Sequence, residues 1–213
     1  SGNCYTTDAK TAEMVKLTEN ASRDNQIAFA NELSIICDNI GIDVWELIRL
    51  ANLHPRVKIL NPGPGVGGHC IAVDPWFIVN TDPENSRLIK TSREINNSKP
   101  TWVVSKIISL LEEKNHEKIV VCGLAYKENV DDFRESPSIR IARSLMELYP
   151  NKVCAIEPNT QAKMVNEIPI VDIKELPPEK CLFIVLVAHD EFSDMSLECD
   201  YLINFTGNTD KPV

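Results

Sequence analysis

A dense group of glycines stands directly before a cysteine in the first half of the chain. The 213 residues include only 8 glycines, and four of these lie within residues 63–68, just before His69 and Cys70. Glycine allows backbone conformations that other residues avoid, and it lets backbone amides come close to a ligand. We therefore predict a strained loop that approaches a ligand with its amides and presents Cys70.

Residues 63–68 also match the G-x-G-x-x-G pattern of dinucleotide-binding loops. That pattern functions where a strand is followed by a helix, with an acidic residue about 20 positions further on. Here the preceding residues lie between helices, and Pro64 fits the second position of the pattern poorly. A ligand-binding loop is favoured over a dinucleotide fingerprint, and also over a simple linker, which needs no such density of glycine.

Three groups of cationic side chains accompany this loop in a chain that is acidic. Lys16, Asn20 and Arg23 are spaced i, i+4 and i+7, which places them on one face of a predicted helix. The other two groups are His54 with Arg56, and Tyr126 and Lys127 with Arg134. A single polar stripe is commonly a solvated helix face, but three such groups beside loops and glycines favour an anionic ligand.

The hydrophobic pattern divides the chain into two halves of different character. Apolar residues at helical spacing predict helices over 8–40 and 43–52, the second with Asp43 as its N-cap. Further helices are predicted from Asp74, over 84–97, from Pro100 to about Asn115 and over 136–149, and strands over 118–123, 152–156, 181–188 and 201–205. Apolar strands that alternate with helices form parallel sheets. The predicted fold class is α/β, with an all-α domain over 1–99 followed by a doubly wound parallel sheet over 100–213.

Composition excludes several classes of partner. The chain carries 22 basic and 31 acidic side chains, a net charge of −9, and no basic run. Nucleic acids and anionic membranes are therefore not expected partners. No apolar stretch approaches the roughly 18–20 residues that cross a bilayer.

The cysteines indicate a reducing compartment. There are 7 at wide spacings, including Cys199, and no two are spaced Cys-x-x-Cys. Neither a zinc site nor a disulfide framework is expected. With no leader-like segment at the start, we predict reduced thiols, a cytoplasmic location and no metal.

Four motifs resemble, in order, those of the UDP-sugar 6-dehydrogenase family. They are Lys16-Leu-Thr-Glu-Asn20-Ala-Ser-Arg23, His54-Pro-Arg56, Gly65-Val-Gly-Gly-His-Cys70-Ile-Ala-Val-Asp74-Pro-Trp-Phe, and Gly123-Leu-Ala-Tyr-Lys127 through Arg134-Glu-Ser-Pro. The resemblance implies oxidation of the C6 hydroxyl of a UDP-hexosamine to a carboxylate, with reduction of two NAD. Residues 70–79 favour N-acetylmannosamine as the sugar. It also implies a helical central domain for dimerisation, followed by a Rossmann-like UDP-binding domain.

The resemblance also implies roles for individual residues. Cys70 is the nucleophile that forms a thiohemiacetal and then a thioester, and Asp74 orients or deprotonates the hydrolytic water. Lys16 and Asn20 stabilise the oxyanions, with Lys16 also as proton donor and acceptor. The substrate-binding set is Lys16, Asn20, Arg23, His54, Arg56, Gly65, Gly67, Tyr126 and Lys127. Arg134 is expected to contact NAD.

The chain departs from the family in two places. No N-terminal NAD-binding domain is present, so we expect a fragment that is inactive alone and whose NAD site lies mostly elsewhere. Thr206 stands where the family usually carries a basic residue. By resemblance, the long helix over 8–40 joins two copies in a homodimer.

Two other functions stay open at this stage. One is a nucleotide-sugar-binding or dimerisation module without chemistry. The other is a cysteine hydrolase that pairs Cys70 with His69, which is disfavoured because adjacent side chains in an extended chain point apart.

Overall fold

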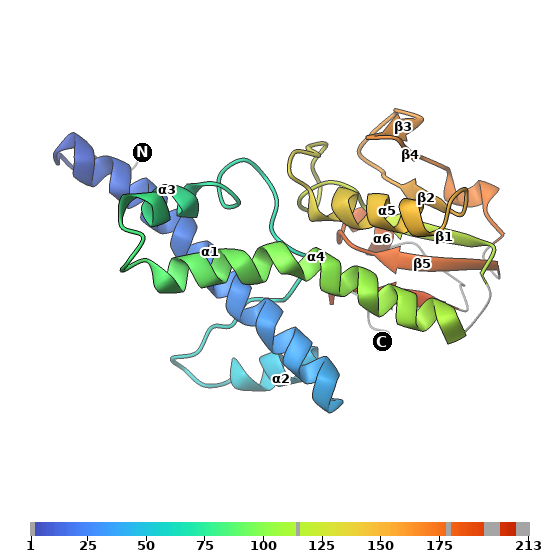
Figure 1. Ribbon diagram of the computed structural model, residues 1–213, viewed down its shortest axis with the longest axis horizontal. Coiled ribbons are helices and arrows are strands. Elements are labelled where there is room, and N and C mark those ends of the chain that lie inside the picture. Colours follow the sequence, from blue (N-terminus) through green and yellow to red (C-terminus); the bar gives the residue numbers. More distant parts are fainter. Residues whose placement is uncertain (1–2, 114–115, 178–179, 194–200, 208–213) are drawn as a thin grey trace.

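The chain forms a helical part and a sheet part that share one long helix (Figure 1). The computed structural model describes residues 3–113, 116–177, 180–193 and 201–207, so Cys199 lies outside the described residues. The helical part consists of α1 (Ala9–Ile40), α2 (Val44–Ala51), α3 (Asp74–Thr81) and the first half of α4 (Arg87–Glu113). The sheet part contains β1 (Lys118–Cys122), α5 (Pro137–Leu148), β2 (Val153–Ile156), β3 (Met164–Val165), β4 (Ile168–Pro169), the 3-10 turn η1 (Ile173–Glu175), β5 (Cys181–Val185), α6 (Asp190–Ser193) and β6 (Leu202–Asn204).

Side-chain caps set the starts of the first two helices. The Asp8 carboxylate accepts a hydrogen bond from the Thr11 N–H at 3.0 Å, and α1 begins at the next residue. The Asp43 carboxylate accepts from the Trp45 N–H at 2.8 Å and begins α2. Such caps satisfy N–H groups that have no partner inside the helix. The predicted helices over 8–40 and 43–52 are therefore confirmed, as is the N-cap at Asp43.

The prediction that a new helix begins at Pro100 is wrong. α4 runs continuously from Arg87 to Glu113 with Pro100 inside it. A proline within a helix removes a backbone hydrogen bond, but burial on both sides of it offsets that loss. Before Pro100, Arg93 is buried against α1, and after it Ile107 is buried against the sheet. α4 is thus the continuous element that joins the two parts.

The second part is built on a four-stranded parallel sheet in the order β2-β1-β5-β6. The chain passes from β1 to β2 at one edge and then back across to β5 and β6, which places its connections on both faces. The predicted doubly wound sheet is confirmed, although β5 ends at Val185 rather than near residue 188. Between β2 and β5 the described residues form the hairpin of β3 and β4 and the turn η1, not an α-helix.

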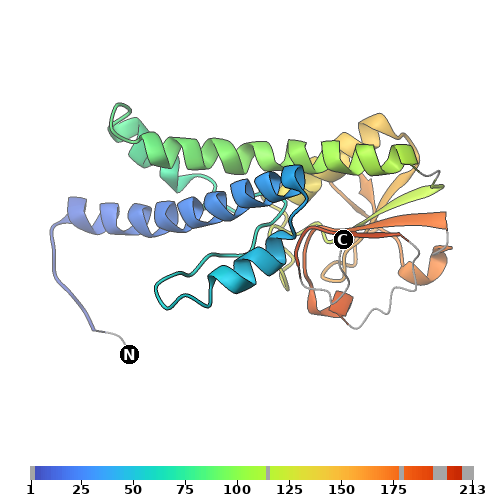
Figure 2. The same ribbon diagram turned by 90° about the horizontal axis from the view of Figure 1, so that it is seen from below.

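Both faces of the sheet are covered. α5 and the second half of α4 pack on one face (Figure 2). Ile107 of α4, Val121 of β1 and Leu145 of α5 belong to the same buried cluster. On the other face, Phe183 and Phe192 belong to a second buried cluster. Burial on both faces explains why the strands are apolar along their whole length. None of the described helices is long and apolar enough to cross a membrane.

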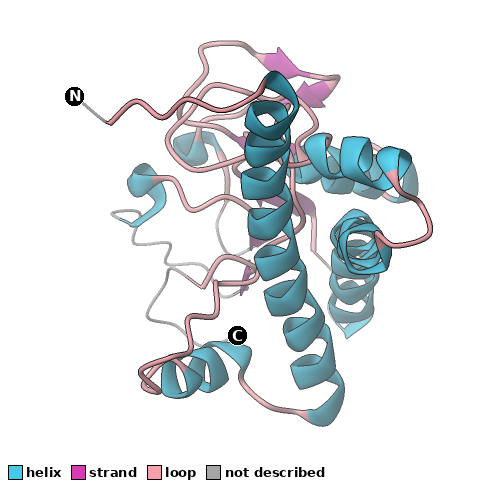
Figure 3. Cartoon of the chain, turned by 90° about the vertical axis from the view of Figure 1, so that its left-hand side faces the viewer, coloured by secondary structure: helices cyan, strands magenta, loops and turns pink. Residues whose placement is uncertain are grey.

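A buried ion pair joins α1 to α4 where the two helices cross. Figure 3 looks along α4 and shows α1 running across it. An Arg93 guanidinium nitrogen lies 2.5 Å from an Asp24 carboxylate oxygen, with both side chains fully buried. The Asn96 amide also donates to Asp24 at 2.7 Å. Burial raises the pKa of the Asp24 carboxyl, and the charge of Arg93 opposes that shift.

The same network reaches the loop that carries Cys70. The Asn31 side chain donates to Asn96 at 2.9 Å, and its oxygen accepts the N–H of Gly63 at 2.9 Å. At the other end of the loop, Arg93 donates to the carbonyl of Ile71 at 3.4 Å. The residues that join the helices therefore also hold the Cys70 loop, residues 61–73.

We predict that Arg93→Met lowers the free energy of unfolding by about 3–5 kcal/mol, because it leaves the Asp24 carboxylate buried and unpaired. Urea denaturation measures the loss. The double variant Asp24→Asn with Arg93→Met should regain part of it, since no buried charge remains.

The control is Lys106→Met, which breaks the ion pair of Lys106 with Asp38. The Lys106 side chain is 32% exposed and that of Asp38 is 30% exposed. That change should cost at most about 1 kcal/mol. Equal losses for Arg93→Met and Lys106→Met would show that the buried network is not what holds the helices together.

Candidate active site

Cys70 lies four residues before α3, and its backbone carbonyl supports the turn that leads into that helix. The Cys70 carbonyl accepts the N–H groups of Val73 at 3.0 Å and Asp74 at 2.8 Å. The Asp74 carboxylate in turn accepts a hydrogen bond from the Asn20 amide of α1 at 2.5 Å. Cys70 and Asn20 are both half-buried. Asn20, Asp74 and Cys70, which the sequence places up to 54 residues apart, are thus brought together.

The other members of the stripe on α1 face outward. Lys16 and Arg23 are exposed. The Lys16 ammonium lies 3.4 Å from the Glu19 carboxylate, and both side chains are more than half exposed. An exposed pair of this kind contributes little to stability, so the ammonium can exchange its partner readily. The stripe therefore has one member held in the protein and two members on its surface.

The Cys70 loop packs tightly on the β1–α5 loop (residues 123–136). A Cβ placed on Gly67 would lie 2.5 Å from the Glu135 carbonyl oxygen and 3.0 Å from Cβ of Tyr126. Gly68 has a φ of 82°, and its N–H donates to the Arg134 carbonyl at 3.1 Å. These two glycines thus permit close contact between loops, whereas we had expected the loop amides to approach a ligand.

Gly65 and Lys127 lie on either side of the junction, which is the contact between the Cys70 loop and the β1–α5 loop. A Cβ added to Gly65 would lie 3.0 Å from Pro137 and 3.1 Å from Pro100. Lys127 is exposed, and its ammonium lies 5.7 Å from the centre of the Tyr126 ring. Its charge is therefore available at the edge of the junction.

Arg134 places a cation near Cys70. Its guanidinium binds the Asp132 carboxylate at 2.6 and 3.0 Å, which lowers the pKa of Asp132 to about 2. Asp132 raises the pKa of Arg134, and the charges of Tyr126 and Cys70 act in the same direction. His69 is exposed, and its charge also acts on Asp132. Cys70 is thus within electrostatic reach of an arginine–aspartate pair, of which we had predicted only Arg134.

Two further predicted positions lie apart from this cluster. His54 and Arg56 are exposed, with the Arg56 N–H donating to Nδ1 of His54 at 3.3 Å. Their loop follows α2 beside the C-terminal half of α1, whereas α3 lies beside its N-terminal half (Figure 1). The Thr206 hydroxyl donates to the Asn204 side chain at 2.8 Å, so it is directed toward its own strand end.

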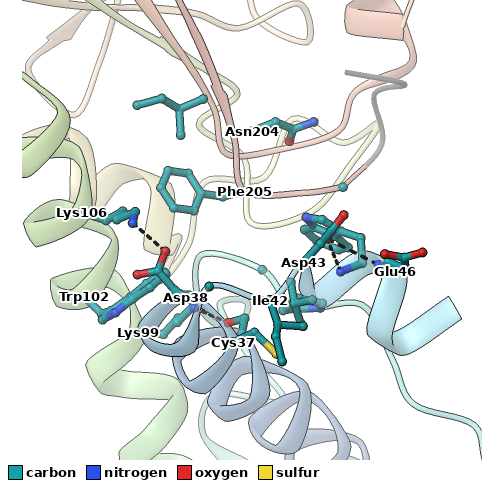
Figure 4. Close-up of a pocket in the computed structure, with 18 of the residues that line it drawn as sticks. Cys37, Asp38, Ile42, Asp43, Glu46, Lys99, Trp102, Lys106, Asn204 and Phe205 are labelled. Carbon is teal, nitrogen blue, oxygen red and sulfur yellow. Dashed lines mark hydrogen bonds and ion pairs between the residues drawn. The ribbon is translucent and has the colours of Figure 1, made fainter. Parts of the chain in front are cut away.

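A cavity of about 930 Å³ lies between α1, α2, the middle of α4 and the segment after β6 (Figure 4). Lys99 lines it, with its ammonium 2.6 Å from the Ser34 hydroxyl and 3.7 Å from the centre of the Trp102 ring. Burial lowers the pKa of Lys99 to about 7, although the charge of Asp38 opposes the shift. None of the predicted site residues lines this cavity. Its lining side chains come from segments far apart in the sequence, so no local spacing pointed to it.

The sheet does not fit the pyrophosphate of a dinucleotide at the position where such sheets usually hold it. That position is the turn after the first strand, where backbone amides face the phosphates. Here the amides of Leu124 and Ala125 donate to the Glu157 carboxylate at 2.7 and 3.1 Å. An anion of the protein already occupies these amides, so we assign no NAD site to this turn. The described residues also contain no group of three or more His, Cys, Asp or Glu side chains that could hold a metal ion.

Two family models match the chain and divide it as the fold does. Residues 10–98 match the central domain of the UDP-glucose/GDP-mannose dehydrogenase family, and residues 120–202 match its UDP-binding domain. The chain therefore belongs to this family, and the resemblance in its four motifs is confirmed.

Individual relatives include proteins with two different sugar names. The chain is 48% identical to the UDP-N-acetyl-D-mannosamine dehydrogenase of Campylobacter jejuni, over 96% of its own length and 51% of that protein. It is 47% identical to the NDP-N-acetyl-D-galactosaminuronic acid dehydrogenase of Ralstonia solanacearum, over 92% of its length and 47% of that protein. The UDP-N-acetyl-mannosamine dehydrogenase structure from Staphylococcus aureus superposes with a TM-score of 0.82 at 43% identity, covering 97% of this chain and 50% of that one. The chain thus spans about half the length of these relatives.

We predict that Gly67→Ala lowers the free energy of unfolding by about 1–3 kcal/mol, because the added methyl group forces the two loops apart. Thermal denaturation measures the change. Gly63→Ala is the matched control, since a Cβ there meets nothing within 4 Å, and it should stay within about 0.5 kcal/mol of wild type. If the two variants were equally stable, the loops would not be in tight contact.

Proposed function

We propose that this chain supplies the substrate-binding and nucleophilic half of an NAD-dependent UDP-sugar 6-dehydrogenase that oxidises UDP-N-acetyl-D-mannosamine to the uronate. Membership of the family supports the reaction class. The observation that carries the proposal is the hydrogen bond from Asn20 to Asp74 at 2.5 Å, one turn from Cys70. It sets the Asn20 amide against the Asp74 carboxylate close to the Cys70 backbone, which supports a shared role for an oxyanion donor, a carboxylate base and a thiol.

Cys70 acts as the nucleophile in this scheme. The first oxidation converts the C6 alcohol to an aldehyde, which cannot readily lose a second hydride until a nucleophile adds to it. The Cys70 thiolate forms a C–S bond to the aldehyde carbon, and the carbonyl oxygen becomes the oxygen of a thiohemiacetal. The second oxidation leaves a thioester on Cys70. NAD would supply the hydride acceptor for each oxidation, with Arg134 of this chain directed toward it and most of its site expected elsewhere.

Asn20, Lys16 and Asp74 complete the scheme. The Asn20 amide and the Lys16 ammonium donate to the oxyanion of each tetrahedral species, and a donor of this kind is worth about 3–4 kcal/mol. Asp74 takes a proton from water as the water attacks the thioester. The C–S bond then breaks, which releases the carboxylate and returns the Cys70 thiol.

The remaining predicted residues bind the nucleotide-sugar. Lys127 and Tyr126 contact it from the UDP-binding domain, and Arg23 contacts it from α1. The backbone at Gly65 and Gly67 shapes the loop between them. Arg134, beside Cys70, is directed toward NAD.

The pair of His54 and Arg56 acts across a homodimer, which agrees with their position away from Cys70 in one copy of the chain. Exposed apolar side chains support this assembly, and they lie on the second half of α1, on α2 and on the loop after α2. Phe29, Ile36 and Ile40 are 52%, 47% and 62% exposed, and Leu50 and Leu53 are 49% and 74% exposed. Large apolar surfaces of this kind are typical of sites that another protein covers.

We predict that Cys70→Ser in the full-length protein abolishes uronate formation from UDP-N-acetyl-D-mannosamine, measured as NADH absorbance. Removal of a nucleophile from a catalytic unit lowers the rate by about 10⁴-fold or more. Cys4→Ser, at an exposed thiol, is the control and should keep the wild-type rate.

Comparing the wild-type rates of NAD reduction with UDP-N-acetyl-D-mannosamine and with UDP-N-acetyl-D-galactosamine tests the choice of sugar.

Turnover by the Cys70→Ser variant at the wild-type rate would refute the nucleophile assignment. Binding of UDP-sugars without any NAD reduction by the wild type would instead favour a non-catalytic binding module.

We predict that Ile40→Asp converts the dimer to a monomer, because it places a charge in the apolar contact between copies. Sedimentation equilibrium measures the mass. Leu148→Asp on α5, at a side chain that is 54% exposed, should leave the dimer intact. A monomeric wild type would refute the proposed assembly.

A further inference from the structure

A buried carboxylate and a buried histidine meet at the carboxyl end of the sheet, outside the site described above. Glu157 directly follows β2, and His189 follows β5. Their side chains are fully buried, with Nε2 of His189 3.3 Å from Oε1 of Glu157. The scheme above gives neither residue a role.

Glu157 holds the first residues of the β1–α5 loop. One of its oxygens accepts the N–H groups of Leu124 at 2.7 Å and Ala125 at 3.1 Å, and the other accepts the N–H of Asn159 at 3.1 Å. Burial favours the neutral acid, but the close approach of His189 and the hydrogen bonds from the loop amides together hold the pKa of Glu157 below its usual range. The group is therefore an anion that fixes the loop at its start.

His189 holds the same loop further along. Its Nδ1 accepts the N–H of Asn129 at 2.9 Å, so in the neutral ring the proton lies on Nε2, which faces Glu157. Asn129 has a φ of 57°, in the left-handed region that asparagine enters more readily than most residues. The Asn129 side chain also accepts the N–H of Asp190 at 3.0 Å, which ties it to the segment after β5.

The two anchors bracket the residues that meet the Cys70 loop. Tyr126 and Lys127 lie between Ala125 and Asn129, and the Tyr126 N–H donates to the Asp132 carbonyl at 3.0 Å. Gly68 packs against the Tyr126 ring, so the position of this ring is also a boundary of the Cys70 loop.

We infer that Glu157 and His189 are positioning residues that take the place of a ligand's phosphate at the β1 turn and hold Tyr126 and Lys127 in position to bind the nucleotide-sugar. The part that concerns the nucleotide-sugar rests on the function proposed above. In dinucleotide-binding sheets the amides of this turn face the pyrophosphate of the ligand. Here the protein supplies its own anion, so the turn is ordered before the substrate arrives, and fewer degrees of freedom are lost on binding.

Amide hydrogen exchange of the full-length protein tests the positioning role without any substrate. In His189→Leu, the amides of residues 124–129 should exchange about tenfold faster or more, because the Asn129 N–H loses its acceptor. His189→Asn retains a side-chain oxygen that can accept that N–H and should restore most of the protection.

Phe192→Leu is the matched control. The Phe192 ring packs against the His189 ring, with 5.5 Å between centroids, and makes no hydrogen bond to the loop. The Phe192→Leu substitution removes packing at the same place and should leave the amide exchange of residues 124–129 within about twofold of wild type. Unchanged exchange in His189→Leu, or an equal increase in Phe192→Leu, would overturn the inference. If His189→Leu does not fold, Glu157→Gln serves instead, since its amide places donors against the Asn159 N–H and His189; its outcomes are judged in the same way.

Steady-state kinetics of the same variants test the link to binding. We expect His189→Leu to raise KM for the UDP-sugar about tenfold while kcat changes less than about threefold, because Cys70 and Asp74 are not on the displaced loop. Faster exchange with an unchanged KM would overturn the part about Tyr126 and Lys127. A wild type that oxidises no UDP-sugar would refute the proposed function, while the exchange measurements would still decide the role of Glu157 and His189.

Discussion

The buried ion pair between Arg93 and Asp24 is the interaction on which the rest of the structure depends. Two buried charges are tolerated when they meet each other and when neighbouring polar groups also hydrogen-bond to them. The Asn96 amide donates to Asp24, and the Asn97 side chain accepts from Arg93. Asn31, which donates to Asn96, holds Gly63 at one end of the Cys70 loop, while Arg93 reaches the carbonyl of Ile71 at the other end. The crossing of two helices and the path of the Cys70 loop are therefore set by one polar network.

The second constraint is steric and lies between the two parts of the chain. Gly67 and Gly68 leave room for Tyr126 and for the backbone of the β1–α5 loop, where any side chain would collide. The UDP-binding domain consequently meets the central domain at the Cys70 loop itself. In the proposed function, substrate contacts from the sheet and the nucleophile from the central domain act on one ligand, because the boundary between the domains is also the candidate site.

The carboxyl ends of the parallel strands differ from those of an ordinary dinucleotide-binding sheet. A parallel sheet with helices on both faces commonly binds a ligand outside the carboxyl ends of its strands. Here the amides at the first of these ends are occupied by Glu157, and the following loop carries the exposed ammonium of Lys127. The loop thus offers a side-chain cation in place of free backbone amides, which agrees with the match to a UDP-binding domain rather than with a second dinucleotide site.

The sequence by itself determined the fold class, the limits of most helices and strands, and the family, because these depend on local periodicity, caps and motifs of contiguous residues. It also predicted Cys70, Asn20 and Asp74 together, although spacing alone could not show that Asn20 and Asp74 are hydrogen-bonded. Only the tertiary structure decided that α4 continues through Pro100, since packing against α1 and the sheet outweighs the local preference of proline. It alone decided the partners of Asp24, Arg93, Glu157 and His189 as well. Charged residues are usually exposed, and their burial depends on partners far along the chain, which no local pattern records.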